Sequence, residues 1–319
     1  MTDQAKEKSS RTELDRLIED FLEHLEIERQ SSPLTIRNYR HYLGRFSNWL
    51  KRNSFKAKPS SIDLEKIKKY RVYLARFSAP NGQLLSRSTQ AYHVIALRSF
   101  LRWLVKNDHQ TLAPEKVDLP KSESRSLKFL STEQVERFLA QPLPSKKTGL
   151  RDKAILETLF STGLRVSELV RLSRDQIDLK RREFGVIGKG GRARVVFLSE
   201  RAVKWLKKYL DNREDNWKPL FIRLGGSQKV EETGEKMRLT ARSVQRIVDK
   251  YSRKAKLPVK VTPHVIRHSF ATDLLIAGAD IRAVQEMLGH KNIQTTQIYT
   301  HVTNRQLRNV HEMFHGKGR

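Results

Sequence analysis

Apolar residues recur every three or four positions through the first hundred residues of this chain. This spacing predicts amphipathic helices, each with one face turned to a core. Ser32 and Pro33 form a typical helix start ahead of the best of them, and we expect about four helices packed together. The apolar stripes are Phe21, Leu22 and Leu25; Leu34, Tyr39, Tyr42, Leu43, Phe46, Trp49 and Leu50; Leu64, Ile67, Tyr70 and Leu74; and Tyr92, Ile95, Phe100, Leu101 and Leu104.

The periodicity stops between about Leu112 and Phe129, where prolines, serines and charges predict an extended linker. Helical patterns resume at Ser131, and the segment LRDKAILETLF predicts a helix that ends near Gly163. Strand-like residues at 184–187 and 194–198 flank a glycine-rich turn and predict a β-hairpin. The pattern predicts a mainly α protein with a small β-sheet, in two domains, 11–112 and 129–319, joined by a linker at 113–128.

The composition of the chain indicates a polyanionic partner. The 319 residues include 63 Lys and Arg against 35 Asp and Glu, a formal charge of +28 and a pI near 10.4. Such a balance indicates nucleic acid binding, although charge alone leaves a ribosomal or merely basic protein open. The absence of cysteine excludes disulfides and thiolate chemistry. The polar start and the lack of a long apolar run predict a cytoplasmic protein without a signal peptide or membrane span.

Six residues in the second half have the chemistry of a phosphoryl-transfer site that needs no metal or other cofactor. Two guanidinium groups can bind the non-bridging oxygens of a phosphate, histidines and a lysine can move protons, and a tyrosine hydroxyl can attack phosphorus once its phenolate is stabilised. The six residues are Arg165, Lys189, His264, Arg267, His290 and Tyr299.

Each segment also has an ordinary interpretation. Arg165 and Glu168 stand three residues apart and share a helical face. Glu168 can therefore orient Arg165 for catalysis, or the two can form an ordinary surface ion pair. Lys189 lies among glycines, as in many turns, and no Ser or Thr follows it as a phosphate-binding loop requires. Taken alone, Tyr299 is a typical core aromatic; a break at Gly289 lets it converge with His290, which follows that glycine.

Thr262 and Pro263 predict the start of a helix that brings His264, Arg267 and His268 to one face. The two histidines have the spacing of a zinc site, but the arginine between them repels a cation and favours phosphate. In the first domain, basic, hydroxyl and amide side chains lie between the apolar stripes and are candidates for DNA contacts or for a solvated face. These candidates are Arg37, Arg40, Arg87, Thr89, Gln90 and His93.

The segments TGLRVSEL, GKGGRARVV, TPHVIRHSFAT and LGHKNIQTTQIYTHV resemble the tyrosine recombinase/integrase family, most of all its cellular Xer recombinases. The resemblance implies a helical, SAM-like core-binding domain and an α+β catalytic domain. It also implies that Tyr299 is the nucleophile that forms a 3′-phosphotyrosyl link, that Arg165 and Arg267 bind the phosphorane, that His264 and His290 assist, and that Lys189 is the general acid.

The resemblance further implies a double-stranded DNA recombination site, a homo- or hetero-tetramer on two such sites, a possible DNA translocase activator and chromosome dimer resolution. It leaves a mobile-element integrase, a type IB topoisomerase and a non-catalytic regulator as rivals. Ala193, Phe197 and the long polar stretch GGSQKVEETGEKMRL depart from the family pattern. A C-terminal apolar stripe suits docking onto a neighbouring subunit, and we expect Tyr299 to be withdrawn before DNA binds. The stripe consists of Leu307, Val310, Met313 and Phe314.

Overall fold

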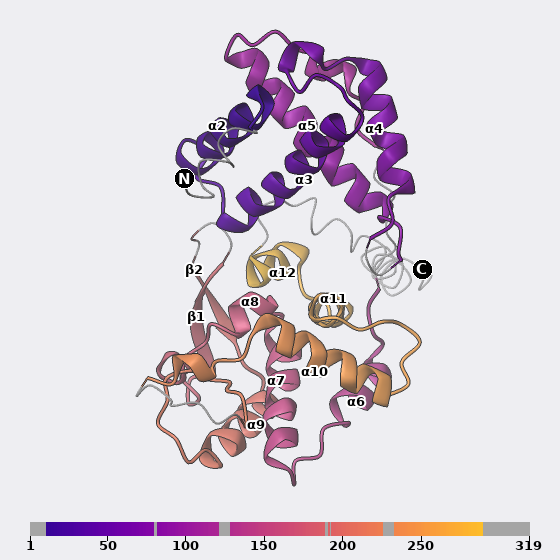
Figure 1. Ribbon diagram of the computed structural model, residues 1–319. Coiled ribbons are helices and arrows are strands. Elements are labelled where there is room, and N and C mark those ends of the chain that lie inside the picture. The colour runs from indigo at the N-terminus through magenta and orange to yellow at the C-terminus, as the bar shows by residue number, and fades with distance from the viewer. Residues whose placement is uncertain are drawn as a thin grey trace, which may run out of the picture. The chain divides into compact units, whose positions relative to one another are not determined.

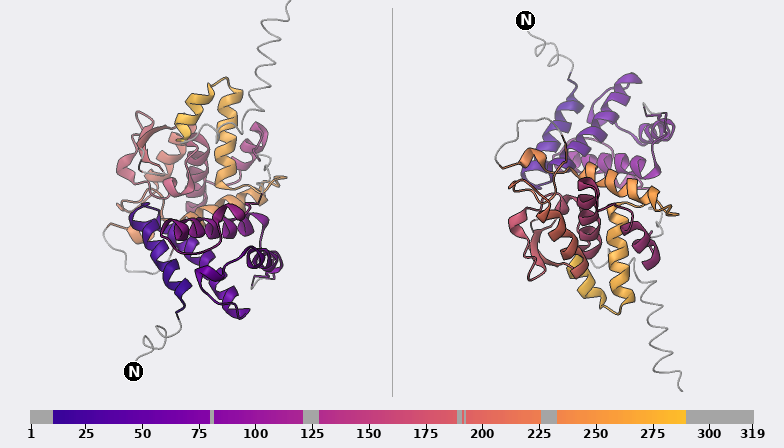
Figure 2. Two further views of the ribbon diagram at one scale, coloured as in Figure 1. Left: turned by 90° about the horizontal axis from the view of Figure 1, so that it is seen from above. Right: turned by 90° about the horizontal axis from the view of Figure 1, so that it is seen from below.

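The computed structural model describes residues 11–79, 82–120, 128–188, 191, 193–225 and 233–289. The chain divides into two compact units, Met1–Ser124 and Arg125–Arg319. Both consist mainly of helices, with one two-stranded antiparallel sheet in the second unit (Figures 1 and 2). None of the helices in the described ranges is long and apolar enough to cross a membrane.

The first unit contains the four helices that its apolar stripes predict. They are α2 (Glu13–Ile27), α3 (Pro33–Arg52), α4 (Leu64–Arg76) and α5 (Arg87–Lys106), with short 3-10 turns η1 (Pro59–Ser61) and η2 (Pro114–Lys116). Their apolar faces meet in one core, whose largest fully buried side chains include Phe21, Phe46, Tyr70 and Phe100. The helical period alone was therefore sufficient to locate these elements.

Side-chain caps set where these helices begin. Ser32 accepts a hydrogen bond from the Thr35 amide at the start of α3, with Pro33 in the first turn, as the sequence predicts. At α2, Asp15 completes a capping box with Thr12 and also accepts from Ser47 and Lys51 of α3, each at 2.6 Å. Partial burial alone would raise the pKa of Asp15, but these hydrogen bonds lower it to about 2.

The segment after α5 differs from the extended linker that its composition predicts. Residues Pro114–Lys116 form η2, and Val117 is buried in the core of the first unit. Pro114 is also buried and Leu112 packs against the same core, so these apolar side chains find sites among the helix side chains. Composition cannot reveal such a site, since it depends on the packed helices.

The second unit is built around α7 (Lys147–Thr162). Apolar side chains surround this helix, which packs against α9 (Glu200–Asp211) and α11 (Pro263–Ile276). The other elements are α6 (Thr132–Leu139), α8 (Val166–Leu169), η3 (Arg174–Gln176), β1 (Glu183–Ile187), β2 (Ala193–Phe197), η4 (Glu235–Met237), α10 (Ala241–Lys254) and α12 (Ile281–Leu288). The strands pair in antiparallel register, with Gly185 opposite Val195, so the predicted hairpin forms despite Ala193 and Phe197.

Charged residues also lie inside α7, and each is paired. Arg151 donates to Asp152, which also accepts from the Tyr251 hydroxyl at 3.0 Å. Lys153 and Glu157 form a buried ion pair of 2.9 Å. Buried charges are tolerated only when they are paired and hydrogen-bonded, so these contacts make a mostly buried helix with charged side chains possible.

The long polar stretch that begins at Gly225 is only partly described, because residues 226–232 lie outside the described ranges. Its second part is held firmly: Met237 and Leu239 are buried, and Arg238 donates to the carbonyls of Val170 and Leu172 at 3.1 and 2.7 Å. Residues 235–239 are therefore packed into the second unit, with the Met237 and Leu239 side chains buried.

Candidate active site

Arg165 occupies the turn between α7 and α8, where it is the N-cap residue of α8. Its Nη1 donates to Glu168 Oε1 and its backbone N–H donates to Glu168 Oε2, both at 2.9 Å. The Arg165 side chain keeps 26 % of its surface exposed, whereas that of Glu168 keeps 5 %. The pair is therefore not an ordinary surface ion pair: a buried carboxylate holds a guanidinium that can still be reached from outside.

Gly163 ends α7 in the left-handed conformation, with φ of 59°. A Cβ atom at this position would lie 2.4 Å from Cδ1 of Phe270, so both the backbone and the space require glycine. The Gly163 carbonyl accepts a hydrogen bond of 2.6 Å from Nη1 of Arg267. The turn that presents Arg165 is thus tied directly to the second predicted arginine.

Arg267 lies on α11 and is only 4 % exposed. Besides the Gly163 carbonyl, its guanidinium binds the Leu288 carbonyl at the end of α12, and Nη2 of Arg165 makes a longer contact of 3.4 Å to the Gly289 carbonyl. Both predicted arginines therefore meet at the carboxyl end of α12, where free carbonyls carry partial negative charge. The structure brings together residues that are 102 positions apart in the sequence (165 and 267).

Glu168 binds a second arginine that sequence reasoning missed. Arg194 of β2 donates to both carboxylate oxygens of Glu168, at 3.1 and 2.8 Å. Burial alone would raise the pKa of Glu168, but the hydrogen bonds and charges of Arg194 and Arg165 lower it to about 2. The carboxylate is consequently ionised at neutral pH and can accept hydrogen bonds from both arginines.

His264 and His268 lie on α11, which begins at Thr262 and Pro263 as predicted. The pKa of His264 is lowered, mainly because the ring is desolvated and to a smaller extent because of the positive charges of Arg267 and Arg165. The pKa of His268 is also lowered, mainly by desolvation of the ring and to a smaller extent by the charges of His264 and Arg267. Both rings are therefore mainly neutral at pH 7 and can each donate and accept one hydrogen bond.

His264 lies near enough to Arg267 and Arg165 for their charges to lower its pKa. In the described ranges, His, Asp and Glu nowhere gather in a group of three or more that could hold a metal ion. The positive neighbours of the His264 and His268 pair favour an anionic ligand, as the intervening arginine predicts.

Three of the six predicted catalytic residues, Lys189, His290 and Tyr299, lie outside the described residues, and so does the C-terminal stripe. The structure does define the segments that lead to two of them. The hairpin brackets residue 189, with Ile187 paired to Ala193. The helix α12 ends at Gly289 in the left-handed conformation, with φ of 63°, directly before His290.

The DNA-contact candidates of the first unit fall into different environments. Arg37 and Arg87 are exposed, whereas Arg40 is bound to Glu19 of α2. Thr89 and Gln90 are half-buried: the Thr89 hydroxyl bonds that of Ser86 at 2.8 Å, and Gln90 donates to the Leu85 carbonyl at 2.8 Å. These last two side chains support the start of α5.

His93 is buried, and its Nδ1 lies 2.9 Å from the Thr89 carbonyl. The prediction that it can meet DNA is therefore wrong for this conformation, because its ring lies inside the helix packing. Its other nitrogen, Nε2, has no hydrogen-bond partner. The helical pattern around His93 placed it beside apolar positions, which is the signal that could have shown its burial.

Arg45 of α3 is another basic residue between the apolar stripes. Its guanidinium lies 4.0 Å from the centre of the Phe77 ring and 3.4 Å from Nε2 of His41, but its buried Nε and Nη1 have no hydrogen-bond partner. Together with Arg37 and His41, at spacings of four residues, it forms a basic row on α3.

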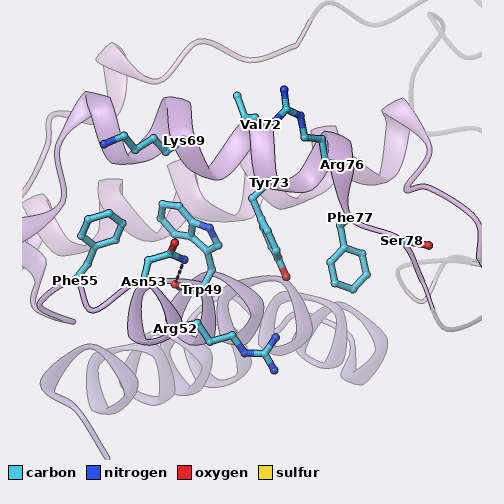
Figure 3. Close-up of a pocket in the computed structure, with 10 residues that line it drawn as sticks. All are labelled: Trp49, Arg52, Asn53, Phe55, Lys69, Val72, Tyr73, Arg76, Phe77 and Ser78. Atoms are coloured by element: carbon cyan, nitrogen blue, oxygen red, sulfur yellow. Dashed lines mark hydrogen bonds between the residues drawn. The ribbon is translucent and has the colours of Figure 1, made fainter.

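An open hollow of about 570 Å³ lies between α3 and α4 (Figure 3). Its walls combine aromatic rings with cationic side chains, among them Trp49, Tyr73, Phe77, Arg52 and Arg76. None of its lining residues belongs to the six predicted catalytic residues, so this hollow is separate from the arginine site.

Comparisons with known proteins cover both units. The family model described as phage integrase family matches residues 128–306, and the phage integrase N-terminal SAM-like domain matches residues 18–108. The chain is 37 % identical over 315 residues to tyrosine recombinase XerC of Pelotomaculum thermopropionicum, covering 95 % of this chain and 98 % of the relative. It is 35 % identical over 305 residues to tyrosine recombinase XerD of Listeria monocytogenes, covering 94 % and 98 %.

Solved structures are similar as well. The crystal structure of XerA recombinase has 30 % identity and a TM-score of 0.50, covering 96 % of this chain and 100 % of that one. XerH recombinase, bound to its difH substrate before cleavage, has 25 % identity and a TM-score of 0.66, covering 92 % and 82 %. With the arginine site, the SAM-like unit and full-length similarity in agreement, the chain belongs to the phage integrase family as an Xer-type tyrosine site-specific recombinase, an enzyme that breaks and rejoins DNA.

Proposed function

We propose that this recombinase cleaves a double-stranded DNA site through Tyr299, with Arg165 and Arg267 binding the scissile phosphate. The convergence of the two guanidiniums at the end of α12 is the observation that carries the proposal. Arg165 and Arg267 are held by carboxylate or carbonyl oxygens, so little reorganisation is required when negative charge develops on the phosphorane. His264 lies beside the same charges and can donate a hydrogen bond to a phosphate oxygen as a neutral ring.

The chemistry is a pair of transesterifications. The Tyr299 oxygen attacks phosphorus and the bond to the 5′-oxygen breaks, which leaves a 3′-phosphotyrosyl link and a 5′-hydroxyl; Lys189 supplies the proton for that oxygen. In the second step, a 5′-hydroxyl of a partner strand attacks the link and releases Tyr299. His290 assists proton transfer. The number of phosphoester bonds is unchanged, so ATP is not consumed.

Trapping on a nicked suicide substrate in EDTA tests this chemistry. The nick releases a short fragment after cleavage, so a covalent protein–DNA adduct accumulates and is visible on a denaturing gel. Wild type is expected to form the adduct, and Tyr299→Phe is expected to bind the same DNA without forming it. Equal adduct from both proteins would contradict Tyr299 as the nucleophile, and an adduct that requires a divalent metal would contradict the proposed chemistry.

The first unit, residues 11–112, is proposed to bind DNA, connected by residues 113–128 to the catalytic domain at 129–319. Its exposed Arg37 and Arg87, with the basic row on α3, can contact phosphates. Substitution of either arginine by alanine is expected to weaken DNA binding. It should also reduce the slope of log affinity against log salt concentration by about one. An unchanged salt slope would remove that residue from the interface.

The proposed biological role is chromosome dimer resolution in the cytoplasm, by a homo- or hetero-tetramer on two sites and with a DNA translocase as possible activator. Relatives named XerC and XerD support this role. Integration of a mobile element is the alternative. Recombination between two copies of the source chromosome's palindromic site, assayed with and without a second recombinase, distinguishes these roles. We further propose that Tyr299 stays withdrawn until the C-terminal stripe docks onto a neighbouring subunit.

A further inference from the structure

Arg194 is bound through all three nitrogens of its guanidinium. Its Nη1 and Nη2 donate to Oε1 and Oε2 of Glu168 at 3.1 and 2.8 Å, and its Nε donates to the Met287 carbonyl at 3.1 Å. Its side chain is only 10 % exposed. A guanidinium whose three nitrogens are all engaged inside the protein has little capacity left for a substrate.

The carboxylate that Arg194 binds is the one that holds Arg165. Glu168 Oε1 accepts from Nη1 of Arg165 and from Nη1 of Arg194, while Oε2 accepts from the Arg165 backbone and from Nη2 of Arg194. Four donors thus converge on one buried carboxylate. If Arg194 were absent, Glu168 would keep only one charged partner, and its rotamer, which orients Arg165, would be less constrained.

Arg194 also joins two other parts of the site. It lies on β2, the strand that follows the Lys189 turn, and it binds α12 one residue before the carbonyl that Arg267 binds. The stem of Arg194 lies close to the end of this helix, because a Cβ atom on Gly289 would be 3.1 Å from its Cδ. The side chain therefore links the hairpin, the Arg165 turn and the helix that precedes His290.

We propose that Arg194 is a positioning residue: acting through Glu168, it holds Arg165 in the geometry that stabilises the phosphorane, without touching the DNA. This inference rests on the proposed role of Arg165 at the scissile phosphate. Arg194→Met keeps the length of the apolar stem but removes the donors. Arg194→Lys keeps the charge but cannot bind both oxygens of Glu168 in the forked geometry.

The same hairpin offers a matched control. Arg182 precedes β1 and its Nη1 donates to Glu200 Oε1 at 2.8 Å, but the two side chains are 48 % and 87 % exposed. Such a pair contributes little to stability. Arg182→Met is therefore expected to cleave at the wild-type rate, although it removes the same type of group from the same hairpin.

The test compares single-turnover adduct formation on two nicked substrates, one with the normal scissile phosphate and one with a neutral methylphosphonate there. The methylphosphonate lacks one charged oxygen, so it depends less on Arg165. We expect Arg194→Met, like Arg165→Ala, to be about 10²-fold slower than wild type on the phosphate, but within about threefold of wild type on the methylphosphonate. Arg194→Lys is expected to recover only part of the lost rate.

An equal loss on both substrates would reduce Arg194 to a structural role, and wild-type cleavage of the phosphate by Arg194→Met would contradict the proposal outright. If Arg194→Met does not fold, adduct formation on the two substrates is compared for Arg194→Lys and Glu168→Gln instead. Thermal unfolding shows whether each variant is folded. Wild type without any adduct, on a site that it binds, would refute the proposed function itself. If wild type forms the adduct normally and the variants lose the same cleavage rate on both substrates, only the positioning role is refuted.

Discussion

Arginines in the two units are held in different ways. At the arginine site of the second unit, Arg165, Arg194 and Arg267 each donate to carboxylate or carbonyl oxygens. In the first unit, Arg45 rests on the ring of Phe77 and leaves two buried donors without a partner. Arg45 is thus less completely hydrogen-bonded than these three arginines, although Arg40 of the first unit is paired with Glu19.

The difference agrees with the roles that we propose for the two units. A group that stabilises a transition state must be oriented before the reaction, because reorganisation adds to the barrier. A group that contacts a DNA backbone gains from adaptability, since phosphate contacts position a protein without demanding one geometry. The oriented arginines of the second unit therefore fit the catalytic role that we propose for them. The following four predictions test this contrast, in order of decreasing effect.

The largest effect is expected from Arg267→Met. This change removes a donor to the phosphate and releases the carbonyls of Gly163 and Leu288. Cleavage of the suicide substrate should fall by about 10³-fold, while DNA binding measured by gel shift stays within severalfold of wild type. Retained cleavage in a folded Arg267→Met protein would show that the oriented arginine is dispensable.

The second prediction concerns Gly163→Ala. The positive φ and the 2.4 Å approach to Phe270 should lower the free energy of unfolding by about 3 kcal/mol, as measured by urea denaturation. Gly44 in α3 provides the control, because a Cβ there meets nothing within 4 Å. Gly44→Ala should stabilise the first unit by up to about 1 kcal/mol; similar losses in both variants would contradict the special role of the Gly163 turn.

The third prediction concerns His93 and acid. Burial, with help from the charges of Arg45 and His41, lowers the pKa of His93 to about 4 from 6.5, against the opposing effect of the Thr89 carbonyl. The unfolded chain therefore takes up this proton first, and stability is lost as the pH falls from about 6.5 to 4, by up to about 3 kcal/mol. Hydrogen exchange of α5 amides should show this loss in wild type, and His93→Gln should show a much smaller one.

A pH-independent exchange rate of α5 in wild type, after correction for the intrinsic rate, would contradict a neutral buried His93. Gln is the chosen replacement because its amide can still donate to the Thr89 carbonyl. A loss of equal size in both proteins would assign the acid sensitivity to other groups, such as Asp15, whose lowered pKa acts at still lower pH.

The smallest effect is expected from Arg45→Met. Its orphaned donors mean that little hydrogen bonding is lost, so the free energy of unfolding should change by less than about 1 kcal/mol. The pKa of His93 should rise, because a positive charge near it is removed; NMR titration of the histidine ring measures this. Arg40→Ala, which breaks an exposed pair with Glu19, should also change stability by less than about 1 kcal/mol but leave the pKa of His93 unchanged.

Much of the fold was predictable from local patterns. Ser32, Pro33, Thr262 and Gly163 act as the starts and ends that their types suggest, because capping and positive φ depend on a residue and its near neighbours. The contribution of Val117 to the first core was not predictable, since one apolar residue in a polar segment carries no period.

The sequence by itself determined the helical units, the hairpin and the chemical types of the proposed catalytic groups, because helix period and guanidinium chemistry are local properties. Only the tertiary structure decided that Arg194 shares Glu168 with Arg165, that Arg267 binds carbonyls of two distant turns, and that His93 is buried. The physical reason is that the partners are mostly backbone carbonyls and buried carboxylates. Every residue has a carbonyl, so only packing selects which one an arginine meets.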